Sequence, residues 1–514
     1  MNEYKYTPLT GPTCRQPPPL ENNYTTLRVG LFFDGTGNSL TNHHQNMNFV
    51  NALLTKCSDT SLAPRTECSF GLNEVSSSLG ALSNIAKAYA MYSTDTSDQL
   101  TVKVYLDGIG TAPGRRNFLL GLALDIGLTS SYSKMMRACR QRIVEQIRKQ
   151  LEQRLSPPGV IDRIEFDVFG FSRGASAARQ FVNLIHRRTQ HPLAKAVTRE
   201  RVLRLREGFD WSNPAECRIR FIGIFDTVCA SPLGRRHLTL QSDCAERVVH
   251  LVAGDESRHF FALTRISEDG EGKHISPHFT EVILPGSHSD VGGGYYSRDE
   301  INHANPHPAL SEGKVIQRFI SIETSQTRLT ASLAYRQAME YARNKVVQGW
   351  ANGIAVLPSL DTPPLLGKVN LLVARRHQPT LASPYAWEVT VEVLLYRVVE
   401  GEYSRIPLRM MIEAARSVGV PFNPWNEESS FLALNSPSKG ENSPILSRLA
   451  TRWQFAAVKG GVVRDLRNEI LGEAYRQLRF TYLHHSADAS FVNGANHRWE
   501  LEKRHHLGNR STDR

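Results

Sequence analysis

The sequence predicts an α/β fold in which a mostly parallel, doubly wound sheet is flanked by helices. Two observations support this prediction. Short apolar segments rich in β-branched and aromatic residues alternate with stretches of helical periodicity, and several of these segments end in a polar or Gly-rich turn. Because the carboxyl ends of parallel strands meet at one edge of a sheet, the residues that follow these segments are expected to lie together. The strand-like segments are 27–33, 102–106, 166–171, 218–228 and 279–284.

The segment 166–179 combines strand-like sequence, a Gly-x-Ser-x-Gly turn and an Ala-rich stretch that favours a helix. This order is typical of a nucleophile elbow, here centred on Ser172. Gly170 and Gly174 would let the strand and the helix approach closely because neither residue carries a Cβ atom. The helix would point its amino terminus at an oxyanion formed near Ser172. The same short string also occurs by chance in ordinary turns, so the prediction depends on this context.

The first strand-like segment, 27–33, ends in the Gly-rich turn 34–38. This turn lacks the Lys-Ser/Thr ending of a phosphate-binding P-loop, so we do not interpret it as one. We expect backbone N–H groups near Gly35 and Thr36 to form one side of an oxyanion hole, with the Arg173 N–H group on the other side. A plain strand-to-helix turn is the alternative interpretation.

Two further strand-like segments lead into residues suited to nucleophilic catalysis. Asp226 lies at the end of 218–228, and His288 lies in a loop that follows 279–284. The order Ser172, Asp226, His288 is that of an α/β-hydrolase triad. In this interpretation Ser172 is the nucleophile, His288 takes its proton and returns it to the leaving group, and Asp226 orients the imidazole. Alone, Asp226 would be a capping residue and His288 a loop histidine, so the combination carries the prediction.

Other residues compete for two of these roles. Asp290 is an alternative acid, but it would have to fold back to reach an imidazole only two residues away. The late histidines His484 and His485 are alternative bases, because the histidine of an α/β-hydrolase often lies late in the chain. We favour Asp226 over Asp290 on this geometry, and we favour His288 over the late histidines because it directly follows a predicted core strand.

We divide the chain into an irregular leader (1–26), a catalytic α/β-hydrolase domain (27–300) and a C-terminal mixed α/β region (301–514). The last is interpreted as a lid or as a membrane-docking or partner region with a basic tail. Residues 39–80 and 118–128 are candidate covers for an apolar cleft. Helices are predicted at 82–92, 132–155, 244–262, 316–324, 330–347 and 408–418, and a further strand at 387–396.

Composition limits the classes of function. The apolar content of 40% and the charged content of 22% are those of a globular protein. No apolar run approaches the roughly 18 residues of a membrane span. The first residues lack the apolar core of an export signal, so we expect synthesis in the cytoplasm without a signal peptide. The net charge of +11 favours anionic partners, but it does not choose between nucleic acid and phospholipid.

The seven cysteines are odd in number and form no Cys-x-x-Cys pair. They are interpreted as scattered reduced thiols rather than as a disulfide framework or a zinc site. No cluster of ligand residues is recognised in the sequence, so neither a metal nor a cofactor is predicted.

Four blocks of sequence resemble a known family. They are Phe-Asp-Gly-Thr-Gly-Asn from residue 33, Gly-Phe-Ser-Arg-Gly-Ala from 170, Phe-Asp-Thr-Val from 225 and His-Ser-Asp-Val-Gly-Gly-Gly-Tyr from 288. These blocks are similar to those of the hydrolase domain formerly called domain of unknown function 2235, which occurs in antibacterial lipase effectors of type VI secretion systems. The resemblance runs from about residue 29 to residue 295 and implies a phospholipase A activity with Ser172, Asp226 and His288 as triad.

The resemblance also implies a biological setting. Such effectors are injected from the cytoplasm of one bacterium into the periplasm of a rival on a spike protein, and an immunity protein protects the producer. The expected substrate is a membrane phospholipid. The alternatives are a carboxylesterase, thioesterase or peptidase of the same fold, or a basic nucleic-acid-binding module without hydrolysis. The last is disfavoured because no groove-reading motif is recognised, so no nucleic-acid partner is expected.

Overall fold

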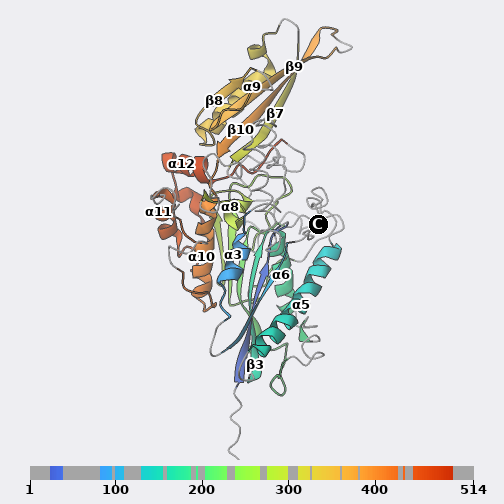
Figure 1. Ribbon diagram of the computed structural model, residues 1–514, viewed down its shortest axis with the longest axis vertical. Helices are drawn as coiled ribbons and strands as arrows, with labels where there is room; N and C mark the ends of the chain where they lie inside the picture. Colours follow the sequence, from blue (N-terminus) through green and yellow to red (C-terminus); the bar gives the residue numbers. More distant parts are fainter. Residues whose placement is uncertain are drawn as a thin grey trace, which may run out of the picture.

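The computed structural model describes two sheets with helices packed against them (Figure 1). The candidate covers 39–80 and 118–128, most of the leader 1–26 and the basic tail of 301–514 lie outside the described residues. The described residues are 24–36, 38, 81–94, 99–108, 129–153, 159–186, 193–194, 203–228, 238–266, 275–298, 311–324, 327–358, 362–379, 383–425, 432–434 and 444–489.

The larger sheet has seven strands in the described part of the chain, and every neighbouring pair is parallel. The strand order is β11-β6-β5-β4-β3-β1-β2. The order changes direction between β1 and β3, and ligands of open parallel sheets bind outside the carboxyl ends of the strands at such a point. The strands are β1 (Tyr24–Phe33), β2 (Gln99–Leu106), β3 (Val160–Phe171), β4 (Cys217–Phe225), β5 (Arg247–Ala253), β6 (Phe279–Leu284) and β11 (Val462–Asp465).

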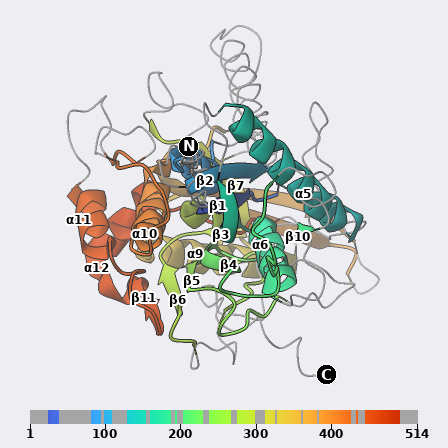
Figure 2. The ribbon, with the colours of Figure 1, turned by 90° about the horizontal axis from the view of Figure 1, so that it is seen from below.

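Helices cover both faces of this sheet, as predicted. Successive residues of a strand point to opposite faces, so the neighbours Phe32 and Phe33 of β1 enter different cores. Phe32 lies in a core with α3 (Asn84–Met91) and α10 (Arg405–Arg416), whereas Phe33 lies in a core with α5 (Thr129–Glu152) and α6 (Arg173–His186). Figure 2 shows α5 and α6 on one side of the sheet, and α10, α11 (Pro444–Trp453) and α12 (Gly472–Tyr482) on the other. The predicted α/β class is therefore confirmed.

The smaller sheet is mixed. Its order is β7-β10-β9-β8, with antiparallel pairing of β10 to β7 and β9, and parallel pairing of β8 to β9. Helix α9 (Leu333–Val347) packs on it through small residues, Ala334, Ala338 and Ala342, which are fully buried. The strands are β7 (Ser311–Thr324), β8 (Ile354–Leu357), β9 (Lys368–His377) and β10 (Ala386–Val398).

Residues beyond 300 contribute to both sheets. Strand β11 extends the larger sheet beside β6, and buried side chains of α10 and α11 share one core with Phe32. The domain boundary at 300 and the lid or docking role of 301–514 stay predictions.

Two predicted helices are wrong. Within 244–262 the structure has β5, all seven residues of which are buried. A strand that is covered on both faces does not alternate between apolar and polar residues, so its continuous apolar sequence resembles that of a buried helix. Within 316–324 the structure has β7, where Ile316 and Ile320 stand four residues apart and imitate helical spacing. The helices predicted at 82–92, 132–155, 330–347 and 408–418 and the strand at 387–396 are confirmed as α3, α5, α9, α10 and β10.

A buried ion pair ties β1 to β3 below the carboxyl edge. Arg28 Nε lies 2.7 Å from Asp167 Oδ2, and both side chains are within 3% of complete burial. Arg28 Nη2 donates to the other carboxylate oxygen at 3.1 Å, and the Tyr92 hydroxyl donates to Oδ2 at 2.8 Å. The charge is therefore satisfied by three donors inside the core, as a buried carboxylate requires.

Candidate active site

Ser172 lies in a sharp turn between β3 and α6. Its φ of 58° is in the left-handed region that non-glycine residues rarely adopt, and its side chain is buried. The neighbouring glycines are required by close packing. A Cβ atom at Gly170 would lie 2.6 Å from Ala175 Cα, and one at Gly174 would lie 2.3 Å from the carbonyl oxygen of Phe33. The residues around Ser172 thus have the strand, strained turn and helix of a nucleophile elbow.

Asp226 follows β4, the strand next to β3. The Ser172 N–H group donates to the Phe225 carbonyl at 3.1 Å, so the two strand ends are joined at this point. Asp226 is fully buried and also has a positive φ, 38°. Its Oδ1 accepts a hydrogen bond from the Ala253 N–H group at 3.0 Å, and its Oδ2 lies 2.5 Å from His288 Nδ1. These bonds fix the carboxylate toward the imidazole.

His288 is the first residue of a short helix, α8 (His288–Gly292), rather than part of a loop as predicted. Its ring packs between Phe171 and Phe261, with ring centroids 4.5 and 5.0 Å away. Its backbone N–H group donates to Glu256 Oε2 at 3.1 Å. With Nδ1 facing Asp226, Nε2 is the ring atom suited to proton exchange.

The competing residues identified in the sequence have other partners than Asp226 and His288. Asp290 Oδ1 is 2.7 Å from His484 Nδ1, and Asp290 Oδ2 accepts from the Ser287 backbone N–H and hydroxyl groups at 2.8 and 2.9 Å. His485 Nε2 lies 3.0 Å from Lys345 Nζ. Asp290 and His484 therefore pair with each other, while Asp226 pairs with His288.

The Gly-rich turn after β1 is organised by Asp34. This buried carboxylate accepts from the Gly35 N–H group at 2.6 Å, from Ser83 Oγ at 2.6 Å and from the Tyr105 hydroxyl at 2.5 Å. Burial raises the pKa of Asp34, and these hydrogen bonds oppose that rise. Because Gly35 N–H already has an acceptor here, Asp34 competes with any oxyanion for it. The oxyanion roles of Gly35, Thr36 and Arg173 stay predictions.

Comparison with known proteins connects this site to a family. Residues 187–311, which include Asp226 and His288, match the family model described as "T6SS, Phospholipase effector Tle1-like, catalytic domain". This segment is similar to the catalytic domain of Tle1-like phospholipase effectors. The family resemblance inferred from the sequence is thereby confirmed over this segment, which holds the blocks that begin at residues 225 and 288.

The Tle1-like likeness extends to the fold of nearly the whole chain. The structure titled "Structure of the Tle1 effector bound to the VgrG spike from the Type 6 secretion system" matches with a TM-score of 0.62 and 22% identity, covering 93% of each chain. At this identity the likeness shows a shared fold. An uncharacterized protein from Pseudomonas aeruginosa matches with a TM-score of 0.28 and 22% identity, over 53% of this chain and 42% of that chain. No curated protein matches the chain.

The described residues show neither a metal-binding cluster nor a membrane-spanning helix. No three His, Cys, Asp or Glu side chains among them gather in a way that could hold a metal ion. None of the described helices has the length and apolarity needed to cross a membrane.

A buried histidine in the Tle1-like segment supports the turn that bears Asp226. The Thr227 N–H group donates to His250 Nε2 at 3.1 Å, so the proton of the neutral ring is on Nδ1. That Nδ1 lies 3.0 Å from Glu281 Oε2, and Arg265 Nε donates to Glu281 Oε1 at 2.5 Å. The sequence interpretation missed this network because His250 lies in the strand that was predicted as a helix.

Burial and hydrogen bonding shift the pKa values of His250 and Glu281. It lowers the pKa of His250 and outweighs the opposing effect of Glu281. Burial would raise the pKa of Glu281, but the His250 hydrogen bond and the Arg265 charge lower it to about 2. The folded protein thus holds a neutral imidazole beside a carboxylate.

The lowered pKa of His250 predicts a loss of stability in acid. Unfolded histidine titrates near pH 6.5, so the unfolded chain binds this proton first as the pH falls. The free energy of unfolding is expected to decrease below about pH 6.5, by at most about 1.4 kcal/mol per pH unit from this group. Urea unfolding at pH 7.5 and 5.5 should show a smaller decrease in His250→Gln than in the unmodified protein. Equal decreases would contradict the assignment.

Proposed function

We propose that the protein is a serine hydrolase of the phospholipase A type that acts on membrane glycerophospholipids. The observation that carries this proposal is the Ser172 elbow, joined by backbone hydrogen bonding to the turn whose Asp226 carboxylate holds His288 Nδ1. The match to a Tle1-like phospholipase catalytic domain supports the choice of substrate class.

The proposed chemistry follows from these positions. Ser172 Oγ attacks the carbonyl carbon of the acyl ester while His288 Nε2 takes its proton. Asp226 stabilises the imidazolium that forms, and backbone N–H groups at the start of α6 stabilise the oxyanion. His288 then gives the proton to the departing alcohol of the lysophospholipid. A water molecule, activated by the same imidazole, attacks the acyl-serine and releases the fatty acid.

The proposed setting is antibacterial type VI secretion. The similar solved structure is titled as a Tle1 effector bound to a VgrG spike, which supports a spike protein as a partner of this chain. In this proposal the protein is made in the cytoplasm, delivered into the periplasm of a rival bacterium and countered in the producer by an immunity protein.

Product analysis tests the substrate class. Purified protein is incubated with vesicles of a phospholipid that carries different acyl chains at sn-1 and sn-2, and released fatty acids are identified by mass spectrometry. We expect fatty acid release, with the chain identity reporting the ester that is cut. Short soluble esters and thioesters serve as the comparison. Hydrolysis of those alone would replace the phospholipase with a carboxylesterase or thioesterase of the same fold.

A further inference from the structure

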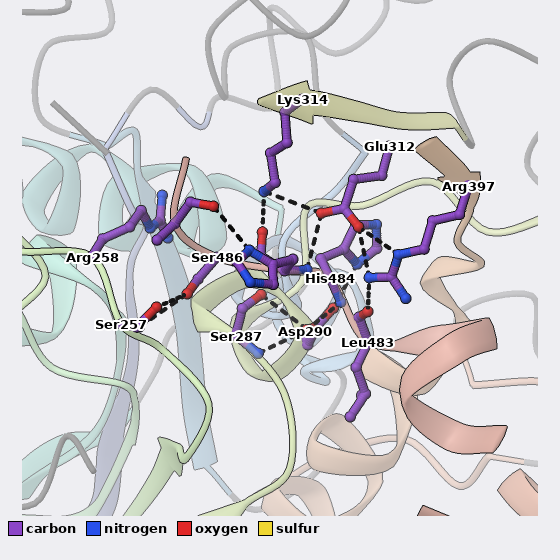
Figure 3. A network of polar contacts seen from close by, with 12 residues as sticks. Ser257, Arg258, Ser287, Asp290, Glu312, Lys314, Arg397, Leu483, His484 and Ser486 are labelled. Atoms are coloured by element: carbon purple, nitrogen blue, oxygen red, sulfur yellow. Dashed lines mark hydrogen bonds and ion pairs between the residues drawn. The ribbon is translucent and has the colours of Figure 1, made fainter. Parts of the chain in front are cut away.

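The segment 483–486 directly follows α12 and runs between the two sheets. Each of its four residues takes part in a hydrogen bond to another part of the chain. We call this segment the strap. Figure 3 shows it between Arg397 of the smaller sheet on one side and, on the other, Ser257, which follows β5, and Asp290 of helix α8. The strap has no regular secondary structure, so its position is set by these side-chain contacts.

The strap is fixed to the smaller sheet by charged groups. Arg397 Nη2 donates to the Leu483 carbonyl at 2.6 Å, and the His485 N–H group donates to Glu312 Oε1 at 2.9 Å. Arg397 Nη2 also lies 2.6 Å from Glu312 Oε2. The two side chains that bind the strap are therefore ion-paired with each other. Lys314 Nζ donates to the His485 carbonyl. Side chains of strands β7 and β10 thus hold one side of the strap.

The other side of the strap contacts the two parts of the chain that hold His288, which are helix α8 and the segment containing Glu256. His484 Nδ1 and N–H lie 2.7 and 2.9 Å from the Asp290 carboxylate, which caps α8 and so fixes the helix that begins at His288. Ser486 Oγ accepts from the Ser257 N–H group at 2.9 Å. Ser257 follows Glu256, whose carboxylate accepts the His288 backbone N–H.

We infer that His484 is a positioning residue for the proposed base: through Asp290 it holds α8 in the orientation that brings the His288 imidazole to Ser172. The inference rests on the proposed function. It assigns the strap to alignment of the active site, in addition to any role of the C-terminal region in covering it. An error of about 1 Å in the position of a reacting group can cost about 10²-fold in rate.

The surroundings of His484 suggest how to separate its two contacts. Its ring stacks on Tyr295 with a centroid distance of 3.4 Å, and its Nδ1 meets Asp290. His484→Phe keeps a ring for the stacking and removes the Nδ1 bond to the carboxylate, while the backbone N–H bond to Asp290 stays. His484→Asn removes the ring and keeps a side-chain N–H donor near the Nδ1 position.

The test measures phospholipid hydrolysis and, separately, the rate at which a fluorophosphonate probe labels Ser172. We expect His484→Phe to lower kcat about 10- to 100-fold with KM unchanged, and to slow labelling by a similar factor. His484→Asn should restore most of both rates. His278→Ala is the matched control, because His278 is an exposed histidine just before β6. Melting temperatures check that each variant is folded.

Each outcome decides between distinct conclusions. If the unmodified protein neither hydrolyses lipid nor reacts with the probe, the proposed function fails. If that protein is active and His484→Phe is labelled at the same rate, only the positioning role fails. If His484→Phe does not fold, His484→Leu takes its place: slower labelling by folded His484→Leu that is restored in His484→Asn supports the positioning role, and labelling of His484→Leu at the unmodified rate overturns it.

Discussion

Ser172→Ala is expected to lower the rate of phospholipid hydrolysis by about 10⁴-fold or more while leaving the protein folded. The substitution removes the hydroxyl that attacks the ester but keeps a side chain of similar size at a strained turn. Because both residues are disfavoured at a φ of 58°, the strain is nearly unchanged and the melting temperature should stay within a few degrees.

The measurement pairs initial rates on phospholipid vesicles with circular dichroism melting. Ser212→Ala, at an exposed serine in the segment that leads into the amino end of β4, is the matched control and should retain full activity. Undiminished hydrolysis by folded Ser172→Ala would remove Ser172 from the proposed triad.

The largest expected effect on stability is at Asp167. Replacing it with alanine leaves the Arg28 guanidinium buried without its carboxylate and the Tyr92 hydroxyl without its acceptor. Breaking a buried pair in this way costs about 3–5 kcal/mol in the free energy of unfolding. Urea unfolding monitored by fluorescence should show this decrease.

Two comparisons make the Asp167 result specific. Asp243→Ala removes a carboxylate whose side chain is 76% exposed and should change the free energy of unfolding by less than about 0.5 kcal/mol. The double variant Arg28→Met, Asp167→Leu removes both charges and should recover most of the loss. A double variant as unstable as Asp167→Ala would show that the packing of this pair, and not its charge, determines the cost.

The elbow could be predicted from sequence because its signals are local. Gly170, Ser172 and Gly174 lie within five residues, between a strand pattern and an Ala-rich helix pattern. Asp226 and His288 could be paired because each comes soon after a strand, and parallel strands bring their ends together. Their roles as a triad remain proposals, but their proximity followed from topology.

The supports of the site could not be predicted in the same way. Asp290 and His484 are 194 residues apart, and nothing near either residue indicates the other. His250 was missed because β5 is buried on both faces, and a continuous apolar run does not distinguish strand from helix. Such networks depend on tertiary packing, for which a single sequence gives no periodic signal.

The pairing of Asp290 with His484 also has a consequence for the order of events during synthesis. A ribosome delivers residue 288 long before it delivers residue 484, so the helix bearing His288 emerges without its partner in the strap. The edge strand β11 is likewise made well after its neighbour β6. Neither contact can form before the later of its two residues has been made. If the strap positions His288 as inferred, a partly synthesised chain has no aligned site until translation has passed the strap.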